Sequence, residues 1–320
     1  MDRRTPFRFL GRAMAFGALL LAVLALVAWS GPPVTPVDFT AASIAKHARA
    51  RAVGSPKVLL VGGSNVAFGV ASGTVEEALC MPVVNLALHA GLGFGYMKNE
   101  AVRFMGPGDL VIVALEESNY TDPVKDHEVL YQMVDRHPDA LRFVPWWDRP
   151  RIMAGLLVLR LQSAWKKATG LWTYAKGHPL YRADGFDARG DMVAHIELPR
   201  PAALQDDGLE PVQDAVSDRF APLADDLERH ARAVGAEVVY TWPGRARSGY
   251  DAARSAAILA TLHEQGRAVL GRPEQFVFPD SMCHDTRYHL RGEGRAERTR
   301  RLLVELCRAR PGRCCTTPAD

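Results

Sequence analysis

Residues 57–69 read Lys57-Val-Leu-Leu-Val-Gly-Gly-Ser64-Asn-Val-Ala-Phe-Gly69, which predicts a strand followed by a helix. A short apolar run that ends in glycines is typical of a buried β-strand. Ser64 follows where the strand ends, and a helix can begin directly after it. Sites form at this carboxyl edge in open parallel sheets, so we expect the Ser64 hydroxyl at such a site. The alternative is a glycine-rich turn in which the serine only caps the helix.

Four further apolar segments predict strands in the rest of the chain. Helical stretches lie between several of them, notably around residues 223–234 and 252–269, and a last helix is expected over 292–310. Continuous apolar strands that alternate with helices are typical of a parallel sheet covered on both faces. The predicted fold class is therefore α/β. The four further strands are residues 82–85, 109–115, 236–242 and 275–278.

The first thirty residues predict an export segment. An apolar run of 17 residues, 13–29, is short for a bilayer span and long for the core of a cleaved signal. We favour an uncleaved signal anchor, and cleavage at the small residues Ala28 and Ser30 is the alternative. The basic flank should stay in the cytoplasm, which places the rest of the chain outside. That flank contains Arg3, Arg4, Arg8 and Arg12.

The order of strands and helices breaks in the middle of the chain, where helical periodicity around Ile152 and Leu156 predicts an inserted helical subdomain or lid. Four of the six tryptophans lie there, and we expect them in its core because aromatic side chains are usually buried. Exposed tryptophans would instead suit sugar rings or a membrane surface. The four are Trp146, Trp147, Trp165 and Trp172. The expected divisions are a signal anchor (1–30), a linker and first helix (31–54), an α/β domain (55–125 and 217–310), the insertion (126–216) and a tail (311–320).

Composition excludes several classes of protein. With 48% hydrophobic and 23% charged residues, the chain is neither disordered nor a polytopic membrane protein. A net charge of +3 does not suggest a nucleic-acid binder. The five cysteines suit an exported domain, and their odd number leaves at least one thiol without an internal partner unless a bridge is intermolecular. We expect Cys307 to pair with Cys314 or Cys315, and Cys80 to be a small buried apolar residue.

A second motif, Asp285-Thr-Arg-Tyr-His289, follows the last predicted strand and precedes the last helix. A histidine oriented by a carboxylate supplies the base that a nucleophilic serine needs. This loop can bring both groups to the sheet edge where Ser64 is expected. A metal site formed by these two residues with Cys283 and His284 fits no common ligand spacing, so we expect neither a metal nor a cofactor.

Together, these two motifs resemble the SGNH/GDSL hydrolase superfamily, and within it the exported branch of alginate O-acetyltransferase-like envelope proteins. Gly62-Gly63-Ser64-Asn65 stands where the family has its Gly-Asp-Ser block. Asp285 and His289 stand where it has an Asp–His pair, here one residue further apart. The resemblance covers roughly residues 55–120 and 217–308. It implies a flavodoxin-like three-layer sandwich in which Ser64 is the nucleophile, His289 the base and Asp285 the orienting carboxylate.

Two further family blocks concern the oxyanion. Asn85-Leu-Ala-Leu-His-Ala-Gly91-Leu-Gly93 resembles the second block, which implies that the Gly91 amide is a donor beside the Ser64 amide. The third block should read Gly-x-Asn-Asp, whereas this chain has Leu115-Glu-Glu-Ser-Asn119. Asn119 lies one residue late and is the remaining candidate donor. The glutamates of this segment are unexpected, because a carboxylate opposes a developing oxyanion.

These features predict an exported, membrane-tethered serine esterase or O-acyltransferase acting on esters of a cell-envelope polysaccharide or peptidoglycan. The expected partners are an acylated polysaccharide or acyl donor, the membrane through residues 13–29, and an envelope protein complex. The expected location is the inner membrane, with the domain on the periplasmic or extracellular side. The alternative is a catalytically weak or inactive accessory protein of a polysaccharide-modifying complex. A lipase acting on membrane lipids is a third interpretation.

Overall fold

A parallel four-stranded sheet in the order β2-β1-β3-β4 forms the centre of the computed structural model. Leu59 of β1 pairs with Val84 on one side and with Val111 on the other. The α/β class and the first four predicted strands are confirmed. The strands are β1 (Val58–Gly62), β2 (Val83–Asn85), β3 (Leu110–Ala114) and β4 (Glu237–Tyr240). The structure describes residues 4–35, 38–122, 127–171, 180–205 and 216–316.

The predicted strand at 275–278 does not join this sheet. Residues Pro273–Phe276 form a 3-10 turn, and β6 (Val277–Phe278) pairs with β5 (Arg245–Ala246) in a separate two-stranded sheet. Beside β4, Tyr240 instead forms a parallel bridge with Val269. The prediction was wrong because Pro273 begins a 3-10 turn that includes Gln275 and Phe276. Only Val277 and Phe278 remain for a strand, and two residues are too few to show a strand pattern.

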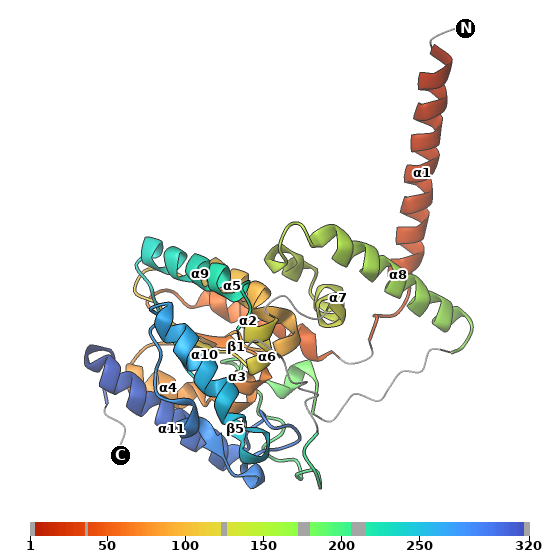
Figure 1. The fold of residues 1–320 in the computed structure, drawn as a ribbon. Helices are drawn as coiled ribbons and strands as arrows, with labels where there is room; N and C mark the ends of the chain where they lie inside the picture. Colours follow the sequence, from red (N-terminus) through yellow and green to blue (C-terminus); the bar gives the residue numbers. More distant parts are fainter. Residues whose placement is uncertain (1–3, 36–37, 123–126, 172–179, 206–215, 317–320) are drawn as a thin grey trace.

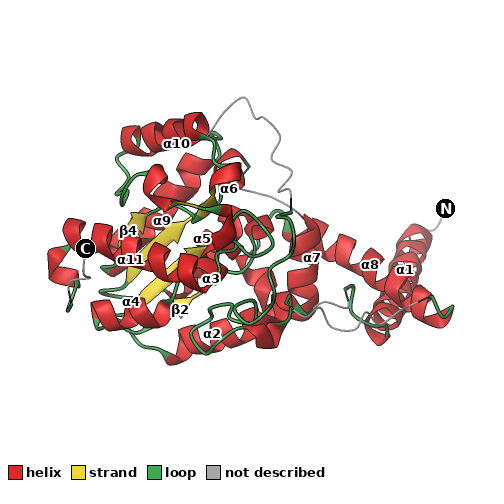
Figure 2. Cartoon of the chain, turned by 90° about the horizontal axis from the view of Figure 1, so that it is seen from below, coloured by secondary structure: helices red, strands yellow, loops and turns green. Residues whose placement is uncertain are grey.

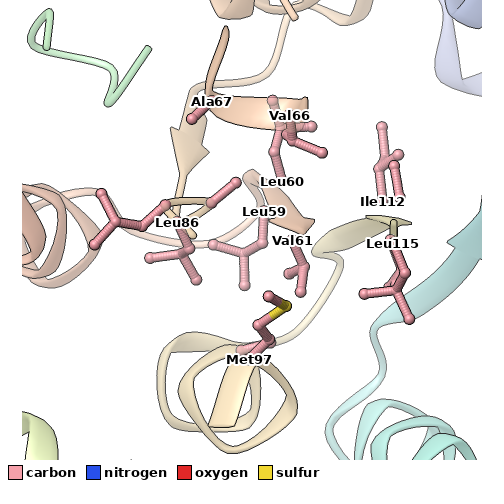
Figure 3. Packing of buried hydrophobic residues seen from close by; sticks show 14 of the residues in the cluster. Leu59, Leu60, Val61, Val66, Ala67, Leu86, Met97, Ile112 and Leu115 are labelled. Atoms are coloured by element: carbon pink, nitrogen blue, oxygen red, sulfur yellow. The ribbon is translucent and has the colours of Figure 1, made fainter. Parts of the chain in front are cut away.

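Helices cover both faces of the main sheet (Figures 1 and 2). α5 and α9 pack together against β1 and β4, whereas α11 packs on α3 and α4. Figure 3 shows the two sides of β1: Met97 of α5 lies near Leu59 and Val61, and Val66 of α3 lies on the side of Leu60. This alternation follows from the two-residue period of a strand. The helices are α2 (Ala42–Ala52), α3 (Ser64–Gly69), α4 (Ser72–Leu79), α5 (Gly93–Phe104), α6 (Glu117–Thr121), α9 (Phe220–Val234), α10 (Ala252–Glu264) and α11 (Gly292–Ala309).

The N-terminal helix α1 (Arg4–Ser30) stands away from the α/β domain (Figure 1). Its segment Phe7–Ser30 has a mean hydropathy of 2.3, which is apolar enough and long enough to cross a membrane or to serve as a signal segment. The insertion contains two helices that pack together near the C-terminal end of α1. They are α7 (His127–Arg136) and α8 (Arg149–Ala168). α8 lies across the last turns of α1.

The chain directly after α1 is held by side chains of α7 and α8. The Arg160 guanidinium donates to the carbonyls of Gly31 at 3.3 Å and Pro32 at 3.1 Å. The Asp135 carboxylate accepts the Val34 N–H at 2.9 Å and forms an ion pair with Arg160. The segment that the sequence predicts to be a linker is therefore fixed to the insertion.

Residues 180–205 are the described part of the second half of the insertion, and they pack into the α/β domain. Their one helical element is the short 3-10 helix Ala183–Gly185. Buried Asp191 accepts the backbone N–H of Ser72 at 2.7 Å and the side-chain amide of Asn85 at 2.8 Å. It also forms an ion pair with Arg295 of α11. Among the described residues of the insertion, α-helices thus occur only in the first half, and residues 180–205 are bonded to the sheet and to α11.

Two disulfides lie near the C-terminus. The bridge Cys307–Cys314 is one of the two predicted pairings. Cys80, expected to be buried, is exposed and bridges to Cys315. The prediction was wrong because Cys80 follows the last residue of α4, where the chain turns to the surface with a φ of 48°. Cys283 is the remaining cysteine, and its thiol is free and buried.

The tryptophans of the insertion do not form its core. The exposed fractions of Trp146, Trp147 and Trp165 are 72%, 63% and 69%. For Trp165 the prediction was wrong because aliphatic side chains such as Ile152 already fill the inner face of α8, whereas Trp146 and Trp147 lie before this helix begins. Trp172 lies outside the described residues.

Candidate active site

Ser64 is the first residue of α3, directly after β1, as the sequence predicts. It is half-buried, whereas the residues on either side of it in the motif are buried, so its hydroxyl is the accessible group of the motif. A Cβ at Gly63 would lie 2.9 Å from Ala90 and 2.7 Å from Glu116 Oε1. The close approach of these two neighbours therefore requires glycine before the serine.

Glu116 places its carboxylate beside Ser64. Its Oε1 accepts the Ser64 hydroxyl at 3.3 Å, the Asn65 backbone N–H at 3.1 Å and the Asn65 side-chain amide at 3.4 Å. Glu116 is buried, so solvent screens its charge little. The negative charge that was unexpected from the sequence thus lies directly at the candidate nucleophile.

His289 and Asp285 form the predicted pair. His289 Nδ1 lies 2.8 Å from Asp285 Oδ1, and both side chains are buried. The other carboxylate oxygen of Asp285 accepts the Tyr181 hydroxyl at 2.5 Å. Burial alone would raise the pKa of Asp285, but the hydrogen bond and charge of His289, together with the Tyr181 hydroxyl, hold it well below its usual value. Asp285 is therefore an ionised carboxylate that can orient the imidazole and stabilise its charged form.

Phe68 joins this pair to the helix that carries Ser64. The Phe68 and His289 rings are stacked, with centroids 3.8 Å apart and an interplanar angle of 7°. Phe68 lies one helical turn after Ser64, so the stack places the C-terminal loop against α3. Among the described residues, Ser64 and His289 share no direct hydrogen bond, and His289 Nε2 makes none.

The two further oxyanion candidates lie near Ser64. The Gly91 N–H donates to His89 Nδ1 at 2.9 Å, and the Asn119 side-chain amide donates to the Ala90 carbonyl at 2.9 Å. Ala90 itself packs beside the residue that precedes Ser64. The structure thus brings Gly91 and Asn119 to this edge with these donors already engaged, and their oxyanion role stays a prediction.

Three residues that contact the site were missed by the sequence analysis. Tyr181 lies in the polar half of the insertion, where no spacing marks it. Phe68 carries a usable signal, because a residue four positions after Ser64 on a helix lies on the same face. Arg298 of α11 is buried and donates to Asn65 Oδ1 at 3.0 Å, and burial lowers its pKa to about 9. It holds the residue next to Ser64 in place.

The neighbouring histidines are neutral groups of the surrounding core. His195 lies 2.8 Å from the Leu290 carbonyl through Nε2, and burial lowers its pKa to about 4. Burial also lowers the pKa of His284 and raises that of the Cys283 thiol to about 12. In the part of the chain that the structure describes, no group of three or more His, Cys, Asp or Glu side chains is placed to hold a metal ion.

No protein-family model and no curated protein matches this chain. Among solved structures, it is similar to the protein YxiM from Bacillus subtilis, with 13% identity and a TM-score of 0.36. The match covers 80% of this chain and 57% of the other, so the chain spans a little over half the length of that protein. A likeness at this TM-score carries no argument about activity.

Proposed function

We propose that the protein is a membrane-tethered serine esterase or O-acyltransferase of the SGNH type. The observation that carries this proposal is the hydrogen-bonded Asp285–His289 pair, stacked through Phe68 on the helix that begins with Ser64. A nucleophile, a base and a carboxylate that orients the base are the three parts that acyl transfer through serine requires.

In the proposed reaction, the Ser64 hydroxyl attacks an ester carbonyl and its proton passes to His289 Nε2. Asp285 stabilises the imidazolium, and the Tyr181 hydroxyl holds the second oxygen of that carboxylate. The ester C–O bond then breaks, and the leaving alcohol takes the proton from His289. Water or a sugar hydroxyl attacks the acyl-serine in the second half, which gives hydrolysis or transfer and frees the Ser64 hydroxyl.

The proposed location follows from the N-terminus. An apolar helix with a basic flank before it favours a domain outside the cytoplasm. The SGNH resemblance and this location together support an acylated envelope polysaccharide or peptidoglycan as the substrate.

A second candidate function is a catalytically weak or inactive accessory protein. The Ser64–Glu116 hydrogen bond favours it, because a carboxylate in this place opposes an oxyanion. The Gly91 N–H and the Asn119 side-chain amide also favour the accessory function, because each already donates to another protein group.

Turnover of 4-nitrophenyl acetate by the full chain in detergent separates the two functions. The esterase proposal predicts saturable hydrolysis that falls by at least about 10³-fold in both Ser64→Ala and His289→Ala. His284→Ala is the matched control, since His284 lies in the same loop without a hydrogen bond to Asp285. Activity that survives Ser64→Ala, or no activity in a folded sample, would reject the enzyme in favour of the accessory protein.

A further inference from the structure

Several large apolar side chains are exposed on α8 and in the segments directly before and after it. We define the Trp face as Trp146, Trp147, Val158, Trp165 and Leu171, whose exposed fractions are 72%, 63%, 53%, 69% and 70%. Contiguous exposed apolar residues mark interaction surfaces. Tryptophan in particular suits the boundary between lipid and water, because its ring is apolar and its N–H is polar.

The geometry of α8 separates the Trp face from the protein core. Ile152 and Leu156 are buried, one turn apart. Val158 and Trp165 are seven residues apart, so they share the outward side of the helix. α8 is therefore apolar toward the protein and also apolar toward the outside, and the described part of the chain does not cover the outward side.

The position of α8 beside α1 indicates what covers that side. A Cβ at Gly31 would lie 2.9 Å from the Ala164 Cβ, so the chain leaves α1 in contact with α8. Arg160 bonds the carbonyls of Gly31 and Pro32 from the same helix. The apolar segment of α1 ends at Ser30, and α8 crosses α1 at this level (Figure 1). A membrane that contains α1 would therefore end at the level of α8.

Unpaired basic residues accompany the Trp face. Arg151, Lys166 and Lys167 are exposed on α8, and none has an ion-pair partner among the described residues. Trp146 and Trp147 also border a groove of about 860 Å³. Arg103 lines the same groove and is exposed. Cationic side chains beside tryptophans complement the negative surface of an anionic bilayer.

We propose that the Trp face lies in the headgroup region of an anionic phospholipid bilayer, with α8 in the plane of the membrane surface. The proposal rests on α1 spanning that membrane and does not depend on the catalytic role of Ser64. The hydrogen bonds from Arg160 to Gly31 and Pro32, together with the Trp face, hold the α/β domain in one orientation against the bilayer. α1 then fixes the position of the chain, and α8 fixes the tilt of the domain.

Tryptophan quenching tests the proposal with the full chain in vesicles of phosphatidylglycerol and brominated phosphatidylcholine. Intact mass first verifies that α1 is retained. All proteins carry Trp29→Phe, which removes the tryptophan of α1, and all keep Trp172, whose signal cancels in the comparison. The test variant replaces Trp146, Trp147 and Trp165 by Phe, and the matched control replaces buried Trp242 by Phe.

The proposal predicts that brominated lipid quenches the parent protein, that the triple variant loses more than half of this quenching, and that the Trp242→Phe control keeps it. Charge reversal by Lys166→Glu and Lys167→Glu should weaken the quenching as well. Equal quenching of the triple variant and its parent would overturn the proposal. A second outcome would also overturn the proposal. If the parent protein forms a dimer in the vesicles without being quenched, and the triple variant is a monomer, the Trp face would bind a second copy of this chain.

Discussion

Replacement of Glu116 by Gln is expected to make Ser64 more reactive. Glu116 Oε1 lies 3.3 Å from the Ser64 hydroxyl, which places an oxyanion formed on a bound ester about 5 Å from the carboxylate. Two unit negative charges about 5 Å apart repel by about 3 kcal/mol at an effective dielectric constant of about 20. This energy corresponds to about 10²-fold in rate. Gln keeps an oxygen for the Asn65 N–H, so we expect acylation to rise by about 10- to 10²-fold.

The assay is the initial rate of 4-nitrophenol release, divided by the folded fraction that thermal unfolding gives. Glu117→Gln is the matched control, because Glu117 is an adjacent buried carboxylate that pairs with Arg245 and accepts a hydrogen bond from Ser255. It should lower stability without raising the rate per folded molecule. A lower rate in Glu116→Gln would refute the reasoning, since it would show that the carboxylate takes the serine proton.

Three further outcomes follow from single contacts. Tyr181→Phe removes the hydroxyl that donates to Asp285 and should lower kcat about 10-fold with KM unchanged. An unchanged kcat would mean that this hydrogen bond does not support the Asp285–His289 pair. Cys80→Ser opens the bridge to Cys315 across 235 residues and should lower the free energy of unfolding by about 2–5 kcal/mol, and an unchanged guanidinium midpoint would contradict this. Burial holds the pKa of His195 near 4, below its unfolded value of about 6.5, so the unfolded chain binds more protons between these values. The contribution of His195 to the free energy of unfolding should then be complete above about pH 6.5 and decrease toward pH 4, by about 2 kcal/mol at pH 5. An equally large decrease in His195→Gln would show that another group causes it.

The central sheet was predictable because its signals are local. Each of the first four strands is a continuous apolar run, and the glycines before Ser64 mark the end of β1. The Asp285–His289 pair was predictable for the same reason, since its members lie four residues apart in one loop. Local spacing therefore gave the nucleophile, the base and the orienting carboxylate as candidates.

The remaining features depend on contacts between distant segments. Tyr181 reaches Asp285 across 104 residues, and no periodicity in the polar half of the insertion indicates this contact. The hydrogen bond between Glu116 and Ser64 depends on how β1 and β3 lie side by side, which the sequence around Glu116 does not indicate. The exposure of Trp165 depends on which side of α8 packs on α7. Both sides of this helix are apolar, so its sequence does not indicate which one is buried.

Covalent labelling of the full chain by a fluorophosphonate, with the labelled residue mapped by peptide mass spectrometry, measures whether Ser64 is an activated nucleophile. The esterase proposal predicts one label, located on Ser64, absent in Ser64→Ala and strongly slowed in His289→Ala. Absence of a label in folded wild-type protein, or a label that persists in Ser64→Ala, would contradict the claim that Ser64 is an activated nucleophile.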